Sequence, residues 1–306
     1  MGKRLFLFLL TNMAVLVVVR LLMMAFGLDS IPYSNGYGGM HYLPWQSVLA
    51  SAALMGFVGS IFSLAISKWM AKRSVGAEVI TAPRNEEEAW LLAIVRNQAN
   101  TKGLGMPEVA IFPSESPNAF ATGMFRNSAL VAVSSGLLRT MTRKQVEAVV
   151  GHEMSHIANG DMVTLTLLQG VLNTFVIFFS RVGGALVDSF LSGRSDDRGE
   201  RRGPGMGSFL VSMVLQVLFG FLASMIVSWF SRQREFRADA GGAQLTSTDA
   251  MAGALANLGG ERTSDLPGGL AAFGFGGGKL MSLFASHPPI EERIAALREK
   301  RYGADS

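Results

Sequence analysis

Four long apolar segments alternate with polar ones along the chain. They are Leu5–Leu28, Ser47–Ile66, Met162–Phe190 and Ser208–Phe230. A helix needs about 20 apolar residues to cross a bilayer, and each segment is long enough to do so. The first segment is also longer than the apolar core of a signal peptide. We therefore predict four transmembrane helices, with helices buried in a large soluble core as an alternative for the last two.

The basic residues predict which side of the membrane each polar segment faces. They precede the first apolar segment and follow the second, at Lys3, Arg4, Lys68 and Lys72. Residues 29–46 contain no Lys or Arg but hold three tyrosines and a tryptophan. Basic flanks stay in the cytoplasm, and aromatic residues gather at membrane interfaces. We therefore predict that residues 29–46 form an extracytoplasmic interfacial loop.

This topology divides the chain into parts inside and outside the membrane. Residues 1–70 contain two membrane helices, and residues 162–230 contain two more, joined by a polar loop at 191–207. Residues 71–161 and 231–306 are then both cytoplasmic. Because both parts lie on one side of the membrane, their side chains can form a common site.

The cytoplasmic parts have the patterns of an α+β fold. An amphipathic helix is predicted at 83–102, with glutamates in its first turns. Thr142 and Gln145 form a capping box at the start of a second helix. Short β-like runs between turn residues predict a small sheet, at 108–112, 118–122 and 128–133. Two later helices are predicted at 248–258 and after Pro288-Pro289.

The helix that begins after Thr142 carries His152-Glu153-Met154-Ser155-His156. Residues four apart lie on the same face of a helix, so the two imidazoles can bind one metal ion. Glu153 lies beside that face and can take a proton from a metal-bound water. This H-E-x-x-H pattern is typical of zinc metalloproteases, although two surface histidines on an ordinary helix would give the same letters.

A catalytic zinc site needs a third protein ligand. The predicted topology excludes His41, and Glu235, just beyond the fourth apolar segment, is the best candidate. Asp239 lies four residues later on the same helical face, where it can accept a hydrogen bond from a ligand histidine. A surface ion pair with Arg232 is the alternative for Glu235. Asp161 could support the site in the same way or simply occupy a helix end.

The composition supports a membrane protein and excludes several kinds of site. Hydrophobic residues make up 49% of the 306 residues, and charged residues only 16%. The chain has no cysteine, which excludes disulfides, thiolate metal sites and cysteine nucleophiles. The formal net charge of +4 is explained by basic flanks of the membrane helices. No basic cluster is interleaved with aromatic residues, so we do not expect nucleic-acid binding.

Together, the segments Gly151–Ile157 and Arg232–Asp239 resemble those of the HtpX family of membrane-bound zinc metalloproteases, relatives of the CAAX-type prenyl-protein endopeptidases. The resemblance implies an α-rich integral membrane protein with a cytoplasmic, zincin-like α+β protease domain. It implies one Zn²⁺ held by His152, His156 and Glu235, with Glu153 as the catalytic base. It also implies a place in the bacterial inner membrane, in the stress response, degrading misfolded membrane proteins alongside other quality-control proteins.

Two further segments resemble features of this family. Asn118, Ala119 and Phe120 resemble an edge strand that binds the substrate as an added strand, although a turn into an ordinary strand is the alternative. His287 precedes two prolines and could stabilise the transition state, or it could cap or pack a helix.

Other functions remain alternatives at this stage. A transporter or scaffold could carry a structural zinc site with four protein ligands. A protease whose site lies within the bilayer is disfavoured by Arg143, Lys144 and Glu147 on the motif helix.

Overall fold

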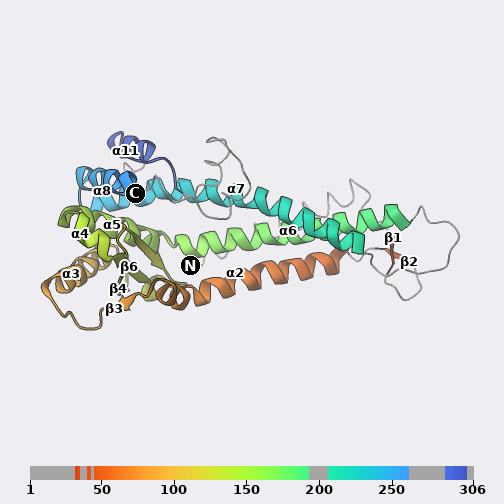
Figure 1. Cartoon of the computed structure of the whole chain (residues 1–306), viewed down its shortest axis with the longest axis horizontal. Helices are drawn as coiled ribbons and strands as arrows, with labels where there is room; N and C mark the ends of the chain where they lie inside the picture. The colour runs from red at the N-terminus through yellow and green to blue at the C-terminus, as the bar shows by residue number, and fades with distance from the viewer. Residues whose placement is uncertain (1–31, 35–39, 43–44, 193–205, 262–286, 302–306) are drawn as a thin grey trace. The chain divides into compact units, whose positions relative to one another are not determined.

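A computed structural model (Figure 1) describes residues 32–34, 40–42, 45–192, 206–261 and 287–301. The chain forms two compact units. The first unit comprises residues 1–61 and 167–224, and the second comprises residues 62–166 and 225–306. The predicted membrane helix at 5–28 lies outside the described residues.

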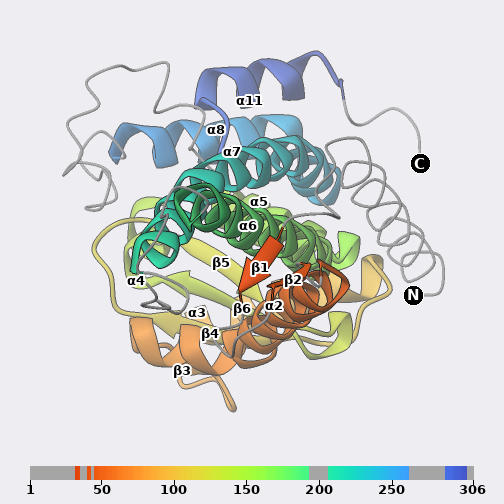
Figure 2. The same cartoon turned by 90° about the vertical axis from the view of Figure 1, so that its right-hand side faces the viewer.

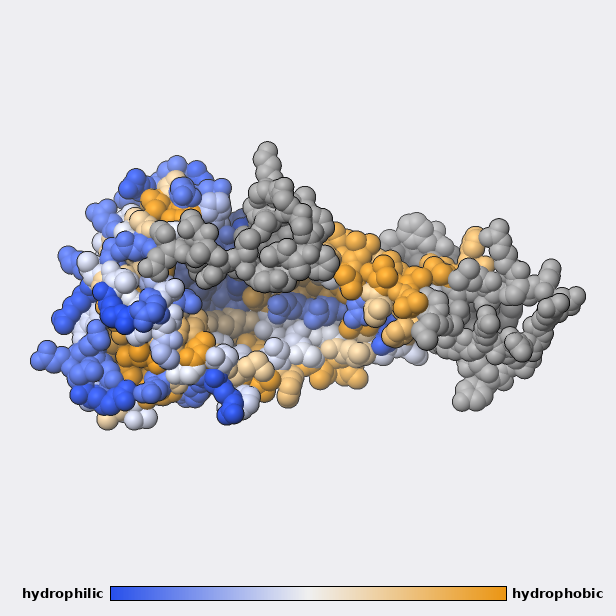
Figure 3. Space-filling view, viewed as in Figure 1, coloured by the Kyte–Doolittle hydropathy of each residue, from blue (hydrophilic) through white to orange (hydrophobic). Residues whose placement is uncertain are grey.

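Three helices among the described residues are long and apolar enough to cross a membrane. They are α2 (Trp45–Val75), α6 (Asp161–Ser192) and α7 (Met206–Leu245). These helices contain the second, third and fourth predicted segments, and α7 continues through residues 231–241 as the sequence predicts. Apolar side chains are exposed along them, and those of α7 include Phe209, Leu218 and Leu222. Figure 3 shows an apolar surface on this part of the molecule. Such a surface is suited to lipid.

Within the first unit, small residues allow α2 and α6 to pack closely. A Cβ atom on Gly56 would lie 2.8 Å from the backbone nitrogen of Thr174, and one on Gly170 would lie 2.6 Å from the ring of Phe57. Helices in membranes commonly associate through such small residues, because the backbones can then approach each other. The Ala-, Gly- and Ser-rich composition of the second apolar segment is thereby explained.

The predicted interfacial loop at 29–46 contains two short strands that the sequence patterns did not predict. Strands β1 (Pro32–Ser34) and β2 (Met40–Tyr42) pair antiparallel, with Tyr33 opposite His41. Aromatic residues favour strands, and the Gly- and Pro-rich composition concealed two runs of only three residues.

The second unit contains a four-stranded sheet in the order β3-β4-β6-β5. Its strands are β3 (Glu78–Val79), β4 (Glu108–Phe112), β5 (Ala119–Thr122) and β6 (Leu130–Ser134). Strands β4 and β6 are parallel, whereas β5 runs antiparallel to β6 and forms an edge of the sheet. The predicted runs therefore became β4, β5 and β6, with shifts of one or two residues for the last two.

Alternating side chains of the sheet enter two apolar clusters. Val109, Val131 and Val133 pack on one face with helices α3 (Glu86–Thr101) and α5 (Arg143–Asn159). Phe112, Leu130 and Ala132 belong to the cluster on the other face. This alternation follows from the two-residue period of a strand. Figure 2 shows that α5 lies close to β5, so the motif helix lies beside the free edge of the sheet.

Two further helices complete the second unit around α5. Helix α8 (Thr248–Glu261) packs against α5, and α11 (Ile290–Arg298) packs against α8. Their buried contacts include Ala148, Met251, Leu255 and Leu297. Two short elements were not predicted, the helix α4 (Ser135–Thr140) and the 3-10 turn η2 (Arg126–Ser128).

Candidate metal centre

Helix α5 holds the two histidines of the motif in fixed positions. The predicted capping box between Thr142 and Gln145 is present at its start. Gly160 ends the helix with φ 64°, a conformation that glycine adopts without strain. His152 and His156 are about one helical turn apart, and their Nε2 atoms lie 3.1 Å from each other. Both rings therefore present a nitrogen to the same point.

Glu235 of α7 lies opposite these two nitrogens. Its Oε1 is 3.3 Å from His156 Nε2, and its Oε2 is 3.6 Å from His152 Nε2. Zinc bonds of about 2.0–2.1 Å in a tetrahedron place ligand atoms about 3.3–3.4 Å apart. The observed separations fit that geometry, so the donor set suits a metal ion. Glu235 is only 4% exposed, which is inconsistent with the alternative of a surface ion pair.

Two glycines of α7 allow Glu235 to reach the histidines. A Cβ atom on Gly242 would lie 2.9 Å from the carbonyl oxygen of Ala148 and 3.0 Å from the nitrogen of His152. A Cβ atom on Gly241 would lie 2.2 Å from Ser155 Oγ. Helix α7 thus crosses α5 at the level of the motif with almost no space between them. Any larger side chain here would separate the third carboxylate from the two imidazoles.

Two aspartates hydrogen-bond the Nδ1 atoms of the imidazoles and so fix the orientation of the rings. His152 Nδ1 donates a hydrogen bond to Asp239 Oδ1 (2.8 Å), and His156 Nδ1 donates one to Asp161 Oδ2 (2.7 Å). A proton on each Nδ1 leaves the lone pair of Nε2 free to bind a metal. Asp161 is also the first residue of α6, so it combines both roles that the sequence left open.

Arg293 of α11 is a residue of the centre that the sequence patterns did not predict. Its Nε donates to Asp239 Oδ2 (2.7 Å), and its Nη2 donates to Asp239 Oδ1 (2.6 Å). The same Nη2 lies 3.2 Å from Glu235 Oε2. One buried guanidinium therefore holds both the third carboxylate and the partner of His152. The available signal was a charge on the apolar face of α11, three residues after Ile290 and four before Leu297.

His287 also contacts Glu235. Its Nδ1 lies 2.7 Å from Glu235 Oε2, so it hydrogen-bonds the oxygen that also faces Arg293. Glu235 Oε1 is then the oxygen that faces His156. The side chain of His287 is 42% exposed, which leaves part of its ring at the surface of the site.

The surroundings of His156 favour positive charge. Burial alone would lower the pKa of His156, but hydrogen bonds to Asp161 and Glu235 and the nearby charge of Glu153 raise this pKa to about 10. The same carboxylates would attract a dication to the Nε2 atoms, where it would replace the proton.

The centre opens into a groove of about 390 Å³. Asn118, Ala119 and Phe120 line one part of it, and His152, Glu153 and His156 line another. Leu255, Leu258 and Ile290 supply an apolar part of the wall. The groove therefore places the free edge of β5 and the centre on one surface, as binding of an extended chain would require.

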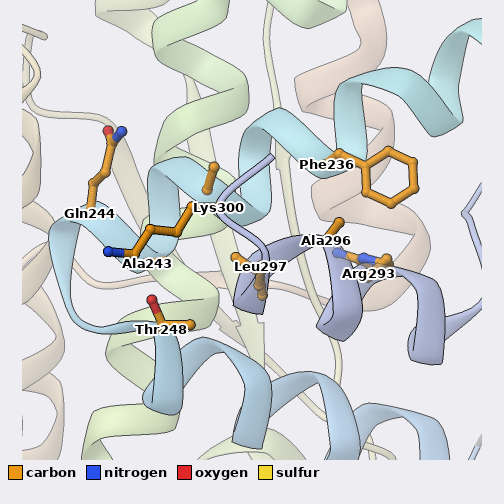
Figure 4. Close-up of a pocket in the computed structure, with 9 residues that line it drawn as sticks. Phe236, Ala243, Gln244, Thr248, Arg293, Ala296, Leu297 and Lys300 are labelled. Atoms are coloured by element: carbon orange, nitrogen blue, oxygen red, sulfur yellow. The ribbon is translucent and has the colours of Figure 1, made fainter. Parts of the chain in front are cut away.

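A second cavity, of about 200 Å³, is lined by residues of α7, α8 and α11 (Figure 4). Phe236 and Gln244 of α7, Thr248 of α8, and Leu297 of α11 line it. Arg293 lines both this cavity and the groove.

Comparisons with known proteins agree with this geometry. The model of peptidase family M48 matches residues 85–301, a range that holds every residue of the centre. The chain belongs to peptidase family M48. Among its M48 relatives, a protease HtpX homologue from Paracidovorax citrulli is 54% identical over 97% of this chain and 98% of that protein. Protease HtpX from Tolumonas auensis is 53% identical over 98% of this chain and 100% of that protein.

A solved structure extends the comparison to the fold. Ste24p from S. mikatae superposes with a TM-score of 0.61 at 19% identity. The superposition covers 81% of this chain but only 58% of Ste24p, so this likeness concerns the fold alone. The family, the relatives and the apolar helices together identify a membrane-bound metalloprotease, and the resemblance to HtpX proteases is confirmed.

Proposed function

We propose that this M48 peptidase is a zinc-dependent endopeptidase whose metal is held by His152, His156 and Glu235. The observation that supports this most strongly is that one donor atom from each of these residues lies within 4.8 Å of the other two. Two imidazoles and a carboxylate are a frequent set for catalytic zinc, with one position left for water. A zinc ion bound there would polarise the scissile carbonyl and lower the pKa of water to about 7.

In this proposal Glu153 is the catalytic base. It follows His152 directly and faces the groove, where it would take the proton of the attacking water and transfer it to the leaving amine. Asp239 and Asp161 would keep the imidazoles in the metal-binding tautomer. His287, partly exposed at the groove, would donate a hydrogen bond to the negative oxygen that develops on the substrate.

The free edge of β5 would hold the substrate. A peptide added beside Ala119 and Phe120 would form main-chain hydrogen bonds there and cross the groove next to the metal. Such pairing depends little on side chains, which suits an enzyme that degrades many unfolded proteins. Asn118 precedes the strand and lines the same groove.

We also propose where the enzyme works. It would lie in the bacterial inner membrane with four spans, the first at residues 5–28, and its centre would face the cytoplasm. Its substrates would be misfolded or damaged membrane proteins, and other membrane quality-control proteins would act with it. The basic residues that flank the first two apolar segments support this orientation.

The test compares two isosteric changes in the purified protein. Glu153→Gln should retain bound zinc and lose at least about two orders of magnitude in cleavage of an unfolded protein, because only the base is lost. Glu235→Gln should lose zinc as well as cleavage. Zinc analysis and product detection by mass spectrometry distinguish them. Full cleavage by Glu153→Gln would contradict the role of Glu153, and wild-type protein that binds zinc but cleaves nothing would favour a structural site in a transporter or scaffold.

A further inference from the structure

Strand β5 and the loop that follows it contact α2 and the end of α5, close to the apolar parts of α2 and α6. Arg126 Nη2 donates a hydrogen bond to the carbonyl oxygen of Ala158, near the end of α5, and the apolar helix α6 begins at Asp161. Thr122 Oγ1 donates to Ser67 Oγ of α2 (3.0 Å), directly after the apolar part of that helix. All these residues belong to the second unit. The loop, residues 123–128, therefore lies at the boundary between apolar and polar helix surfaces.

Chain geometry limits the distance of this loop from the apolar helix. Ala158 precedes Asp161, the first residue of α6, by three residues, and because Gly160 ends α5 between them, their Cα atoms are at most about 11 Å apart. The polar headgroup layer adds about 5–8 Å to each side of the hydrocarbon core. A group that contacts Ala158 is thus close to the start of the apolar helix, at or next to the headgroup layer when α6 spans the membrane.

The side chains exposed at this level suit that layer. Phe125 at the loop tip is 57% exposed, and Trp69 of α2 is 62% exposed. Arg126 is exposed beside Phe125, and Arg73 stacks over Trp69 at 5.9 Å. Exposed aromatic residues next to cations are typical of membrane interfaces, because the ring enters the headgroup layer while the cation meets lipid phosphates.

The local charge also favours an anionic surface. Lys68 and Lys72 both form ion pairs with Glu108, at 2.7 and 3.0 Å, so one positive charge of that cluster is not balanced by Glu108. Arg126 binds a neutral carbonyl group rather than a carboxylate. Both observations indicate attraction to anionic phospholipids at this side of the unit.

We propose that the 123–128 loop inserts Phe125 into the headgroup layer of anionic phospholipids. Strand β5 ends at Thr122, so its free edge runs directly into this loop. A polypeptide segment leaving the bilayer beside Phe125 would meet the edge strand at once. This second consequence rests on the proposed function, whereas the contact with lipid does not.

The absence of cysteine from the chain allows a direct depth measurement. Phe125→Cys is labelled with bimane in nanodiscs of phosphatidylcholine and phosphatidylglycerol that contain lipids with a headgroup nitroxide. The matched control is Glu115→Cys, before the opposite end of β5, where the side chain is 92% exposed. We expect about threefold stronger quenching at position 125, because contact quenching requires the label to be within the lipid layer. Equal quenching at both positions would overturn the proposal, as would a protected label that lipid nitroxides do not quench, since the latter would indicate a protein partner.

A second measurement tests the consequence for substrates. Phe125→Asp would place a negative charge against anionic lipid and should slow cleavage of a membrane-anchored unfolded reporter about fivefold, with little effect on a soluble one. Equal slowing of both reporters would overturn the link between the loop and substrate capture. If wild-type protein cleaves neither reporter, the proposed function fails, but the quenching result still decides whether the loop contacts lipid.

Discussion

The two histidines of the centre are supported in different ways, although each has an aspartate behind it. Asp239, the partner of His152, receives two hydrogen bonds from Arg293 that both measure 2.7 Å or less. The carboxylate of Asp161, the partner of His156, has its nearest described guanidinium contact at 3.9 Å, from Arg234. Arg234 instead donates to the backbone oxygen of Asp161 (2.5 Å). His152 is thus supported by an aspartate in a bidentate ion pair, whereas His156 is supported by an aspartate at the start of a helix without such a pair.

This difference shows where the centre depends on distant parts of the chain. Arg293 connects Asp239 to Glu235, so the support of His152 and the third carboxylate share one cation from α11. The support of His156 is local, because Asp161 follows it by five residues. Changes on the His152 side should therefore disturb two metal-binding groups, and changes on the His156 side only one.

Replacement of Arg293 should have the largest effect. Arg293→Met leaves the carboxylates of Asp239 and Glu235 buried without their cation, and breaking one partner of a buried ion pair costs about 3–5 kcal/mol. Thermal unfolding in detergent should show this loss, and metal content should fall with it. The matched control is Arg298→Met, an exposed arginine on the same helix, which should change neither. Equal effects of the two substitutions would show that Arg293 does not support the centre.

Asp239→Asn should have the next largest effect. The amide keeps the shape but removes the charge that orients His152 and pairs with Arg293, and loss of such outer contacts typically weakens metal binding by about 10–100-fold. Competition with a fluorescent chelator measures the affinity. Asp249→Asn, an exposed aspartate on α8, serves as the control for a change of charge alone. Unchanged metal affinity in Asp239→Asn would show that Asp239 does not support metal binding.

Asp161→Asn should weaken metal binding by about tenfold, at the lower end of the same range. Its carboxylate contacts the ring of His156, and within the described part of the chain no bidentate cation transmits the change to Glu235. The same chelator competition applies. If this substitution proved more damaging than Asp239→Asn, the local support would be the dominant one and the comparison would be reversed.

Sequence patterns predicted those parts of the centre that depend on helix geometry. The spacing of His152 and His156 places them on one face, and the four-residue step from Glu235 to Asp239 does the same on α7. The structure brings both pairs together because Gly241 and Gly242 allow the two helices to touch. That close crossing is a long-range property, which periodicity within either helix does not contain.

The residues that were missed depend on how separate elements dock. Arg293 and the contact of His287 with Glu235 require α11 to pack on α8, more than 50 residues after Glu235 in the chain. The amphipathic pattern predicted α11 itself. It did not predict which residues the buried arginine of this helix, Arg293, would contact. The β1–β2 pair was missed for a different reason, since strands of three residues give too little alternation to detect.

Arg234→Met should have the smallest effect of the four substitutions on these two supports. The guanidinium of Arg234 stabilises the start of α6 through the oxygen of Asp161 and lies 5.6 Å from the ring of Phe230. Its Nε, however, is buried and has no hydrogen-bond partner among the described residues, so part of its desolvation cost is not recovered. Methionine would lose one charge-assisted hydrogen bond and remove that cost, and metal affinity should fall by less than about tenfold. A loss as large as that of Arg293→Met would show that Arg234 holds the carboxylate of Asp161 as firmly as Arg293 holds Asp239, and the two supports would then be equivalent.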